Sequence, residues 1–495
     1  MLVKCVIIFI LTAGKFLFVK NSQVNIARNR QAFQSTTRVY SPDDTSYAYR
    51  ANDDNINIHH LPQTVIFQCS ATSAYETGSW ISIDLGKIYL ITKVMVLSRD
   101  TNRYKDLKNF TIYAEDFPKS TKRNFCYYKE NIVKRALSTA LSYYETYDCA
   151  VNAIGSFLTV DHLAGTKYLS LCDLQVFGDF IKERDYDIID YTNNKFYAGT
   201  PFNPNLQLSH LMDNNLTTFF RSRNEENINK LPFFRLDLEY YYEIYGLIVV
   251  GATSANSKEF SFMYISISDY PQTMKSTLNK YCVENFNPAQ TSYKDGKSYI
   301  FKCSQPIRGQ YILIHMIDEN DVKSKHFFEF SELFVYGRKI GNPNSNRNTK
   351  DIVAMHESSI DRKSFLLDGI YISRGSSFEL NQVNNNYVRA TLSPPIDIKV
   401  FCITANHAGT VNNGIRITIK DISNVQKAYL LSGNYRYEQT VCEIIPETQA
   451  SQIEITSLGS HAILEVEIFE RGIISTKFKI MTQIIHVYSS KNISY

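Results

Sequence analysis

Residues 168–178 read Tyr168-Leu-Ser-Leu-Cys172-Asp-Leu-Gln-Val-Phe177-Gly178. In this stretch the apolar Leu174 and Val176 alternate with Asp173 and Gln175, and a period of two is typical of a β-strand with one buried face. Similar strands occur twice more, as Phe328-Glu-Phe-Ser-Glu332-Leu-Phe-Val-Tyr336-Gly337 and Ala462-Ile-Leu-Glu465-Val-Glu-Ile-Phe469. The sequence therefore contains a repeated β-strand unit.

Two further features precede each of these strands in the same order. The first is an Asp-centred turn, at Asp53, Asp213 and Asp368, which are 160 and 155 positions apart. The second is a strand pair; its members are Trp80–Leu85 with Ile91–Leu97, Phe233–Leu238 with Ile244–Val250, and Tyr387–Leu392 with Ile396–Ile403. Asp84, Asp237 and Thr391 follow one another at 153 and 154 positions. This nearly constant spacing indicates three tandem copies.

Many short alternating strands separated by Asn, Asp, Gly and Pro turns predict an all-β fold of three tandem antiparallel β-sandwich, or jelly-roll, domains. A chain of 495 residues is also too long for one hydrophobic core. We expect the domains at 23–180, 186–340 and 350–472, called modules one, two and three below. Linkers are expected near 179–187 and 339–350, and residues 473–495 form a C-terminal tail.

The composition, 44% hydrophobic and 21% charged, is that of a folded protein. A net charge of +4, with acids and bases interspersed, gives no basic patch for nucleic acid. The sequence has no Gly-x-Ser-x-Gly, no His-Glu-x-x-His and no phosphate-binding glycine loop. We therefore expect a protein that is not an enzyme.

The N-terminus predicts a signal peptide over residues 1–22, because Lys4 precedes a short apolar run, Cys5–Leu11, and then small residues. A short signal anchor is the alternative. No later stretch has the roughly 20 apolar residues of a transmembrane segment. Without Cys5 eight cysteines remain, an even number that suits disulfides in a secreted, extracellular protein. N-glycosylation sequons lie at Asn109, Asn215 and Asn492.

Module one resembles the galactose-binding-like superfamily, specifically the fucolectin/tachylectin branch that is related to coagulation-factor discoidin domains. The resemblance runs from Asn25-Ile26-Ala27 through Trp80 and Asp84-Leu85 to the closing strand that ends at Gly178. Modules two and three match the family more weakly, through the strands quoted above.

The resemblance implies two disulfides in module one, Cys69–Cys172 and Cys126–Cys149. Cys282–Cys303 repeats the second pattern in module two, and by elimination Cys402 pairs with Cys442. The alternative is a set of buried free thiols.

The family also has a structural calcium site, in which an oxygen-rich turn and an acid of the closing strand surround the ion. The corresponding residues of module one are Asp53, Asn55, Asn57 and Asp173; those of module two are Asp213, Asn215, Thr217 and Glu332. Ordinary turn chemistry, with side chains capping the backbone, is the alternative reading of such turns.

The family's sugar site combines one His with two basic residues. Here Arg99 stands at the first basic position, and Arg103 and Lys105 lie around the second. The His position falls on Ala71, between Ser70 and Thr72, so the sequence departs from the family there. The corresponding loops of modules two and three lack Arg. We expect any sugar site to lie in module one.

Three functions follow from these observations. The first is a secreted lectin that binds fucose-like or related glycans and glycoproteins through a calcium-stabilised module one. The second is an extracellular adhesion or scaffold protein whose modules bind protein partners, which the missing sugar residues of modules two and three favour. The third, lipid binding, requires apolar spikes flanked by basic residues, and the Tyr40–Tyr49 loop has little positive charge nearby.

Overall fold

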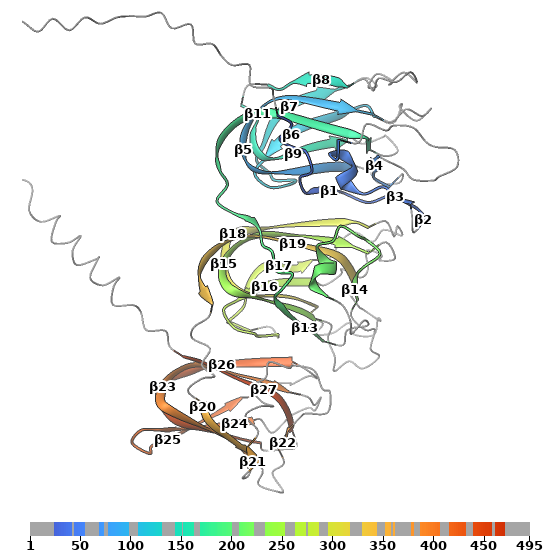
Figure 1. Cartoon of the computed structure of the whole chain (residues 1–495). Coiled ribbons are helices and arrows are strands. Elements are labelled where there is room, and N and C mark those ends of the chain that lie inside the picture. The colour runs from blue at the N-terminus through green and yellow to red at the C-terminus, as the bar shows by residue number, and fades with distance from the viewer. Residues whose placement is uncertain are drawn as a thin grey trace, which may run out of the picture. The chain divides into compact units, whose positions relative to one another are not determined.

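The structure is a computed structural model of the chain (Figure 1). It describes residues 24–41, 44–54, 69–73, 78–98, 107–130, 144–150, 152–162, 169–199, 207–221, 233–252, 263–273, 276–286, 296–316, 329–343, 352–357, 360–361, 378–380, 387–405, 415–431, 439–457 and 461–470. Within these residues the regular structure consists of β-strands and two short 3-10 helices, η1 (Ala48–Ala51) and η3 (Leu208–Leu211). The all-β, antiparallel fold expected from the sequence is therefore confirmed.

The chain forms two compact units. One comprises residues 1–34 and 43–184, and the other comprises residues 35–42 and 185–495. The first unit contains one large sheet, and the second contains two, within modules two and three respectively. The strands of modules two and three are thus separate sheets within one compact unit.

In module one the sheet is built on β5 (Trp80–Leu97), an 18-residue strand. The other members of this sheet are β1 (Ala32–Gln34), β6 (Phe110–Glu115), β7 (Arg123–Lys129), β8 (Glu145–Asp148), β9 (Ile154–His162) and β11 (Asp173–Glu183). The first half of β5 pairs with β1 and β9, and its second half pairs with β11 and β8. The strand bends at Gly86, whose φ of 77° is accessible to glycine without strain.

This long strand corrects one expectation. The sequence predicted two separate strands, Trp80–Leu85 and Ile91–Leu97, whereas the structure runs them together as one strand that serves both layers of the sandwich. Between the layers lies an apolar core that includes Ile81, Ile83, Val94 and Val96, each buried. Bending one strand across two layers gives both halves a buried face with the same alternation.

Modules two and three repeat this design. In module two the long strand is β15 (Phe233–Gly251), with β12 (Asp187–Ile188), β13 (Lys195–Gly199), β14 (Phe220–Arg221), β16 (Met263–Ser268), β17 (Lys280–Phe286), β18 (Ser298–Met316) and β19 (Glu329–Pro343). In module three it is β23 (Tyr387–Ala405), with β20 (Ile352–Glu357), β21 (Ile360–Asp361), β22 (Phe378–Leu380), β24 (Ile415–Asp421), β25 (Gln426–Leu431), β26 (Gln439–Ser457) and β27 (His461–Glu470). The long strand of each module is thus the common framework.

The ends of the closing strands reach into the segments expected to be linkers. β11 continues to Glu183 and β19 continues to Pro343. In module one the extension of β11, Asp179–Glu183, pairs with Lys87–Leu90 of β5. The backbone N–H and C=O groups of β5 continue the antiparallel ladder there. Only the remainder of each expected linker is left to connect the sheets.

All four expected disulfides are present: Cys69–Cys172, Cys126–Cys149, Cys282–Cys303 and Cys402–Cys442. Such bonds persist in oxidising compartments, so they suit an extracellular protein. No helix among the described residues has the length and apolar character needed to cross a membrane.

Candidate functional site

The expected ligand-binding end of module one is held by a disulfide. β5 ends at Leu97, two residues before Arg99, and the Leu97 carbonyl accepts a hydrogen bond of 2.9 Å from the backbone N–H of Cys172. Leu97 also packs against the Cys69–Cys172 bond. Arg99, Arg103 and Lys105 themselves lie outside the described residues. The structure therefore describes the end of β5, which precedes these three residues in the sequence.

Ser70 and Thr72 lie beside this disulfide but face inward. Ser70 belongs to β4 (Ser70–Ala71), which pairs with β10 (Ser170–Leu171). The Ser70 hydroxyl donates to the Leu171 carbonyl at 2.9 Å, and the Thr72 hydroxyl accepts from the Leu169 N–H at 2.9 Å. Both residues are 0% exposed. Their hydroxyls hold β4 against β10 and thereby position the chain around Cys69.

The acidic turn of module one is satisfied by protein donors. Asp173 is fully buried, and its Oδ2 accepts hydrogen bonds from the Tyr144 hydroxyl (2.6 Å) and from Gln175 Nε2 (3.1 Å). Burial raises the pKa of Asp173, and these two donors oppose the rise. Of its two oxygens only Oδ1 has no hydrogen-bond partner within the described residues.

The neighbouring Asp54 is paired as well. Its carboxylate forms an ion pair of 2.6 Å with Arg28 and accepts a hydrogen bond of 3.1 Å from Asn25. Asp53 is half-buried, and Asn55 and Asn57 lie outside the described residues. Donors of the protein therefore meet both Asp54 and Asp173, and of these two acids only Asp173 was expected to hold calcium.

Module two contains the corresponding acidic turn, but its acids have different hydrogen-bond partners. Asp213 accepts hydrogen bonds from the Asn215 N–H (2.7 Å) and the Thr218 hydroxyl (2.8 Å). The Asn215 side-chain carbonyl accepts from the N–H and hydroxyl of Thr217, at 3.1 and 2.8 Å. These bonds give the turn the local side-chain-to-backbone geometry typical of Asp and Asn.

Glu332 of β19 lies against this turn with an unsatisfied carboxyl. It is 2% exposed, and neither of its Oε atoms has a hydrogen-bond partner within the described residues. Burial, followed by the nearby Asp213 carboxylate, raises the pKa of Glu332 to about 9, and the N–H groups of Asn215 and Asn214 oppose the rise. Two adjacent carboxyls cannot both ionise cheaply unless a cation neutralises them.

The residues of module two thus fit a hard cation, which prefers oxygen ligands from carboxylates, side-chain amides and carbonyls. Within the part of the chain that the structure describes, no group of three or more His, Cys, Asp or Glu side chains is placed to hold a metal. Any ion here would therefore need neutral oxygens beside the two acids.

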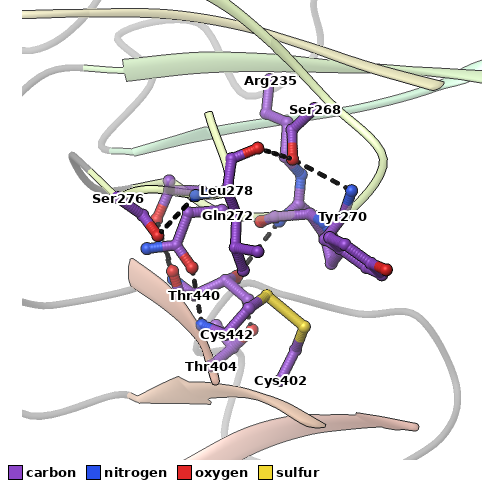
Figure 2. Close-up of a disulfide and its surroundings, with 12 residues drawn as sticks. Arg235, Ser268, Tyr270, Gln272, Ser276, Leu278, Cys402, Thr404, Thr440 and Cys442 are labelled. Atoms are coloured by element: carbon purple, nitrogen blue, oxygen red, sulfur yellow. Dashed lines mark hydrogen bonds between the residues drawn. A yellow bond between two sulfur atoms is a disulfide. The ribbon is translucent and has the colours of Figure 1, made fainter. Parts of the chain in front are cut away.

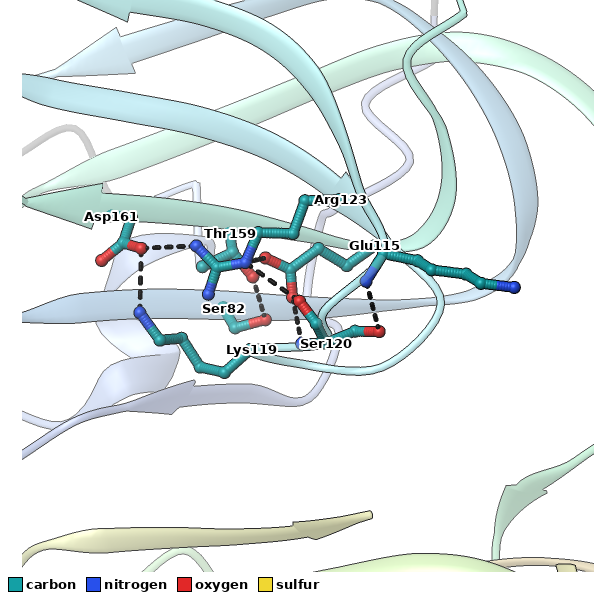
Figure 3. A network of polar contacts seen from close by, with 8 residues as sticks. Ser82, Glu115, Lys119, Ser120, Arg123, Thr159 and Asp161 are labelled. Carbon is teal, nitrogen blue, oxygen red and sulfur yellow. Dashed lines mark hydrogen bonds and ion pairs between the residues drawn. The ribbon is translucent and has the colours of Figure 1, made fainter. Parts of the chain in front are cut away.

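A second polar network, visible in Figure 3, lies in module one. Asp161 of β9 forms ion pairs with Lys119 (2.8 Å) and Arg123 (2.7 Å), and Arg123 also contacts Glu115 at 3.3 Å. The Ser120 N–H donates to Glu115, and burial raises the pKa of Glu115 to about 7. These contacts fasten the turn between β6 and β7 onto its own sheet, a positioning role that the sequence pattern did not indicate.

Two of the three glycosylation sequons fall on described residues. Asn109 is half-buried with a φ of 51°, and Asn215 is half-buried in the module-two turn. Asn492 lies outside the described residues.

The geometry defines an all-β protein with disulfide-held strand ends and one unsatisfied acidic turn. Its sequence matches no protein-family profile and no curated protein. Among solved structures it is similar to a fucolectin from the serum of striped bass, Morone saxatilis, with 19% identity, coverage of 64% of this chain and 99% of that chain, and a TM-score of 0.26.

Two further neighbours cover a smaller part of the chain. The lectin domain of lectinolysin in complex with Lewis b antigen has 23% identity, covers 32% of this chain and 97% of that chain, and has a TM-score of 0.25. A fucose-binding module of Streptococcus pneumoniae has 21% identity, covers 32% and 98%, and has a TM-score of 0.26. At these identities and TM-scores the likeness does not establish what this chain binds.

Proposed function

We propose that the chain is a secreted, non-catalytic carbohydrate-binding protein that recognises fucose-like or related glycans through module one. Its glycan contacts come from Arg99, Arg103 and Lys105, and Ser70 and Thr72 position the adjacent chain. In this proposal residues 1–22 are a signal peptide and Asn109, Asn215 and Asn492 are glycosylation sites.

One observation carries this proposal. The Cys69–Cys172 disulfide and the hydrogen bond from Cys172 to Leu97 hold the end of β5 against β4 and β10. The segment that leads to Arg99 and the segment that carries Ser70 and Thr72 therefore start from one rigid base. A weakly binding sugar requires donors that are already in place, because ordering a loop on binding costs affinity.

Calcium belongs to this proposal chiefly in module two. Asp213 and Glu332 would supply the charged ligands, and Asn215 and Thr217 would supply neutral oxygens. Bound there, the ion supplies the positive charge that an ionised Glu332 lacks, and it would fix the turn to β19. In module one the Tyr144 hydroxyl already donates to one oxygen of Asp173, which supports the alternative of ordinary turn chemistry there.

A glycan array tests the proposal. The secreted protein should bind a subset with terminal fucose, and Arg99→Ala should reduce that binding by tenfold or more, because a charge-assisted hydrogen bond contributes about 1.5–3 kcal/mol. The matched control is Arg338→Ala, which removes an exposed Arg of module two and should leave binding unchanged.

If the folded protein binds no glycan at high concentration, the lectin proposal is wrong. The alternative of an adhesion or scaffold protein then takes its place, and a search for a protein partner is the next step. Equal loss of binding in Arg99→Ala and Arg338→Ala would instead place the site outside the Arg99 loop.

A further inference from the structure

Module two contacts module three through the turn that follows β16. The tip of this turn is Tyr270, Pro271, Gln272 and Thr273, all of them buried. Figure 2 shows Tyr270 and Gln272 of this turn together with Thr440 and Cys442. Gln272 Oε1 accepts a hydrogen bond of 2.6 Å from the Cys442 N–H. Thr273 accepts from the Thr440 N–H through its hydroxyl at 2.8 Å, and its own N–H donates to the Thr440 carbonyl at 3.2 Å. Backbone groups of module three are thus satisfied by module two.

The part of β26 that receives these bonds is the edge of a sheet. Among the described residues, β26 pairs with β24 only from Ala450 to Ser457, whereas Gln439 to Glu443 pairs with β23 alone. An edge strand presents a row of N–H and C=O groups that favours pairing with another segment. The Gln272–Thr273 segment covers that edge through one backbone hydrogen bond and two side-chain acceptors.

Side chains extend the contact on both sides of this edge. Arg235 of β15 is 3% exposed, and its Nη1 donates to the Pro271 carbonyl (2.5 Å) and to the Thr440 hydroxyl (3.1 Å). Tyr270 packs edge-on against Phe469, with ring centroids 5.2 Å apart. Tyr270 and Phe469 also enclose the Cys402–Cys442 disulfide in one apolar cluster.

Module one contains the corresponding turn, but there the turn contacts its own sheet. Asp116-Phe117-Pro118-Lys119-Ser120 stands 153 positions before Asp269-Tyr270-Pro271-Gln272-Thr273. In module one Lys119 pairs with Asp161 and Ser120 bonds to Glu115, so the turn is fastened to its own sheet (Figure 3). The neutral Gln272 and Thr273 stand at the positions of Lys119 and Ser120, and they bond to backbone groups of β26 instead.

The edge that is covered lies at a particular end of module three. In module three, Thr404 of β23 is paired with Thr440 of β26 and with Glu465 of β27. In module one, Leu97 of β5 is paired in the same way with Asp173 of β11, so Thr404 corresponds to Leu97. Asn406 is therefore the counterpart of Arg99, and it follows Thr404 by two residues. Module two therefore contacts module three near the end of β23, the strand that precedes the counterpart of Arg99.

We propose that modules two and three work as one rigid body, in which the Gln272–Thr273 segment seals the open edge of β26, and that this end of module three serves module docking. The partner of this surface is module two of the same chain. The inference stands independently of glycan binding, because it rests on contacts within modules two and three.

Hydrogen exchange on the full chain tests it directly. In Gln272→Ala/Thr273→Val the amides of Thr440 and Cys442 lose their acceptors and should exchange at least tenfold faster, while the amides of β24 keep their rates. The matched control is Lys119→Ala/Ser120→Val in module one, which should leave Thr440 and Cys442 unchanged. Thr273→Ser keeps the hydroxyl and should retain most of the protection.

Reduction of the disulfides gives a second readout. Cys402 and Cys442 are 0% and 5% exposed, so a mild thiol should reduce this bond slowly in the wild type and at least tenfold faster in the double variant. Unchanged exchange and unchanged reduction in Gln272→Ala/Thr273→Val would overturn the proposal. Equal acceleration in the module-one control would overturn it as well.

Discussion

Asp173 and Glu332 occupy the same position of the repeat but have opposite surroundings. Asp173 accepts hydrogen bonds from Tyr144 and Gln175 at Oδ2 and has no partner at Oδ1 within the described residues. Neither oxygen of Glu332 has a partner of standard hydrogen-bond geometry there, and the N–H groups of Asn214 and Asn215 favour its charged form against the nearby Asp213 carboxylate. A buried acid is stable when donors or a cation satisfy it, and costly otherwise. Module one supplies donors to one oxygen of its acid, so we expect a cation to have its larger effect in module two.

The largest effect that tests this comparison is expected from Glu332→Gln. We expect calcium to stabilise the wild-type protein by about 2.7 kcal/mol when its concentration is a hundred times its Kd. Glu332→Gln removes a charged ligand, so it should lower the calcium affinity by about 100-fold or more. Thermal unfolding with calcium and with a chelator measures both quantities. Gln has nearly the same shape as Glu, so the unfolding temperature in chelator should change little.

Asp173→Asn is the matched control in module one. It should leave the calcium-dependent rise in unfolding temperature intact, because Tyr144 and Gln175 already donate to one oxygen of Asp173. A calcium effect that survives Glu332→Gln but disappears in Asp173→Asn would reverse the comparison and return the site to module one.

A smaller effect is expected from pH. Because the pKa of Glu332 is raised to about 9 from its usual 4.5, the folded metal-free protein holds a proton there that the unfolded chain releases. This group therefore favours folding below pH 4.5, and its contribution is lost as the pH rises towards 9. Calcium needs the ionised carboxylate, so its affinity should rise by up to about tenfold per pH unit between pH 6 and 8.

Calorimetry in buffers of different ionisation enthalpy measures this linkage. Near pH 7 the binding of one calcium ion should release about one proton. In Glu332→Gln any residual calcium binding should lose the pH slope. A wild-type affinity that is flat from pH 6 to 8 would contradict a proton on Glu332.

Alternation and repeat spacing predicted the strands and the positions of both acids, whereas the disulfide pairings came from the family resemblance and, for Cys402–Cys442, from elimination. The sequence could not predict what surrounds each acid. Tyr144 is 29 residues from Asp173, and Thr273 is 167 residues from Thr440, so neither contact leaves a periodic signal. The inward orientation of Ser70 and Thr72 was likewise missed, because a two-residue strand such as β4 is too short for alternation to reveal its faces.

The smallest effect is expected from Tyr144→Phe, which removes one donor to Asp173 and also the acceptor of a hydrogen bond from Gln175 Nε2. A buried carboxylate that loses a hydrogen bond should cost about 1–3 kcal/mol of unfolding free energy, measured by denaturant unfolding in chelator. Tyr128→Phe, an exposed tyrosine of β7, is the control and should cost close to nothing.

The pH dependence of that cost identifies its cause. The Tyr144 hydroxyl favours the ionised form of Asp173, so its removal penalises the protein only while the carboxylate is charged. The loss in Tyr144→Phe should therefore be full near pH 8 and shrink as the pH falls through the pKa of Asp173. A loss that is the same at all pH values would mean that the Tyr144 hydroxyl acts through its neutral hydrogen bond with Gln175 rather than through the charge of Asp173.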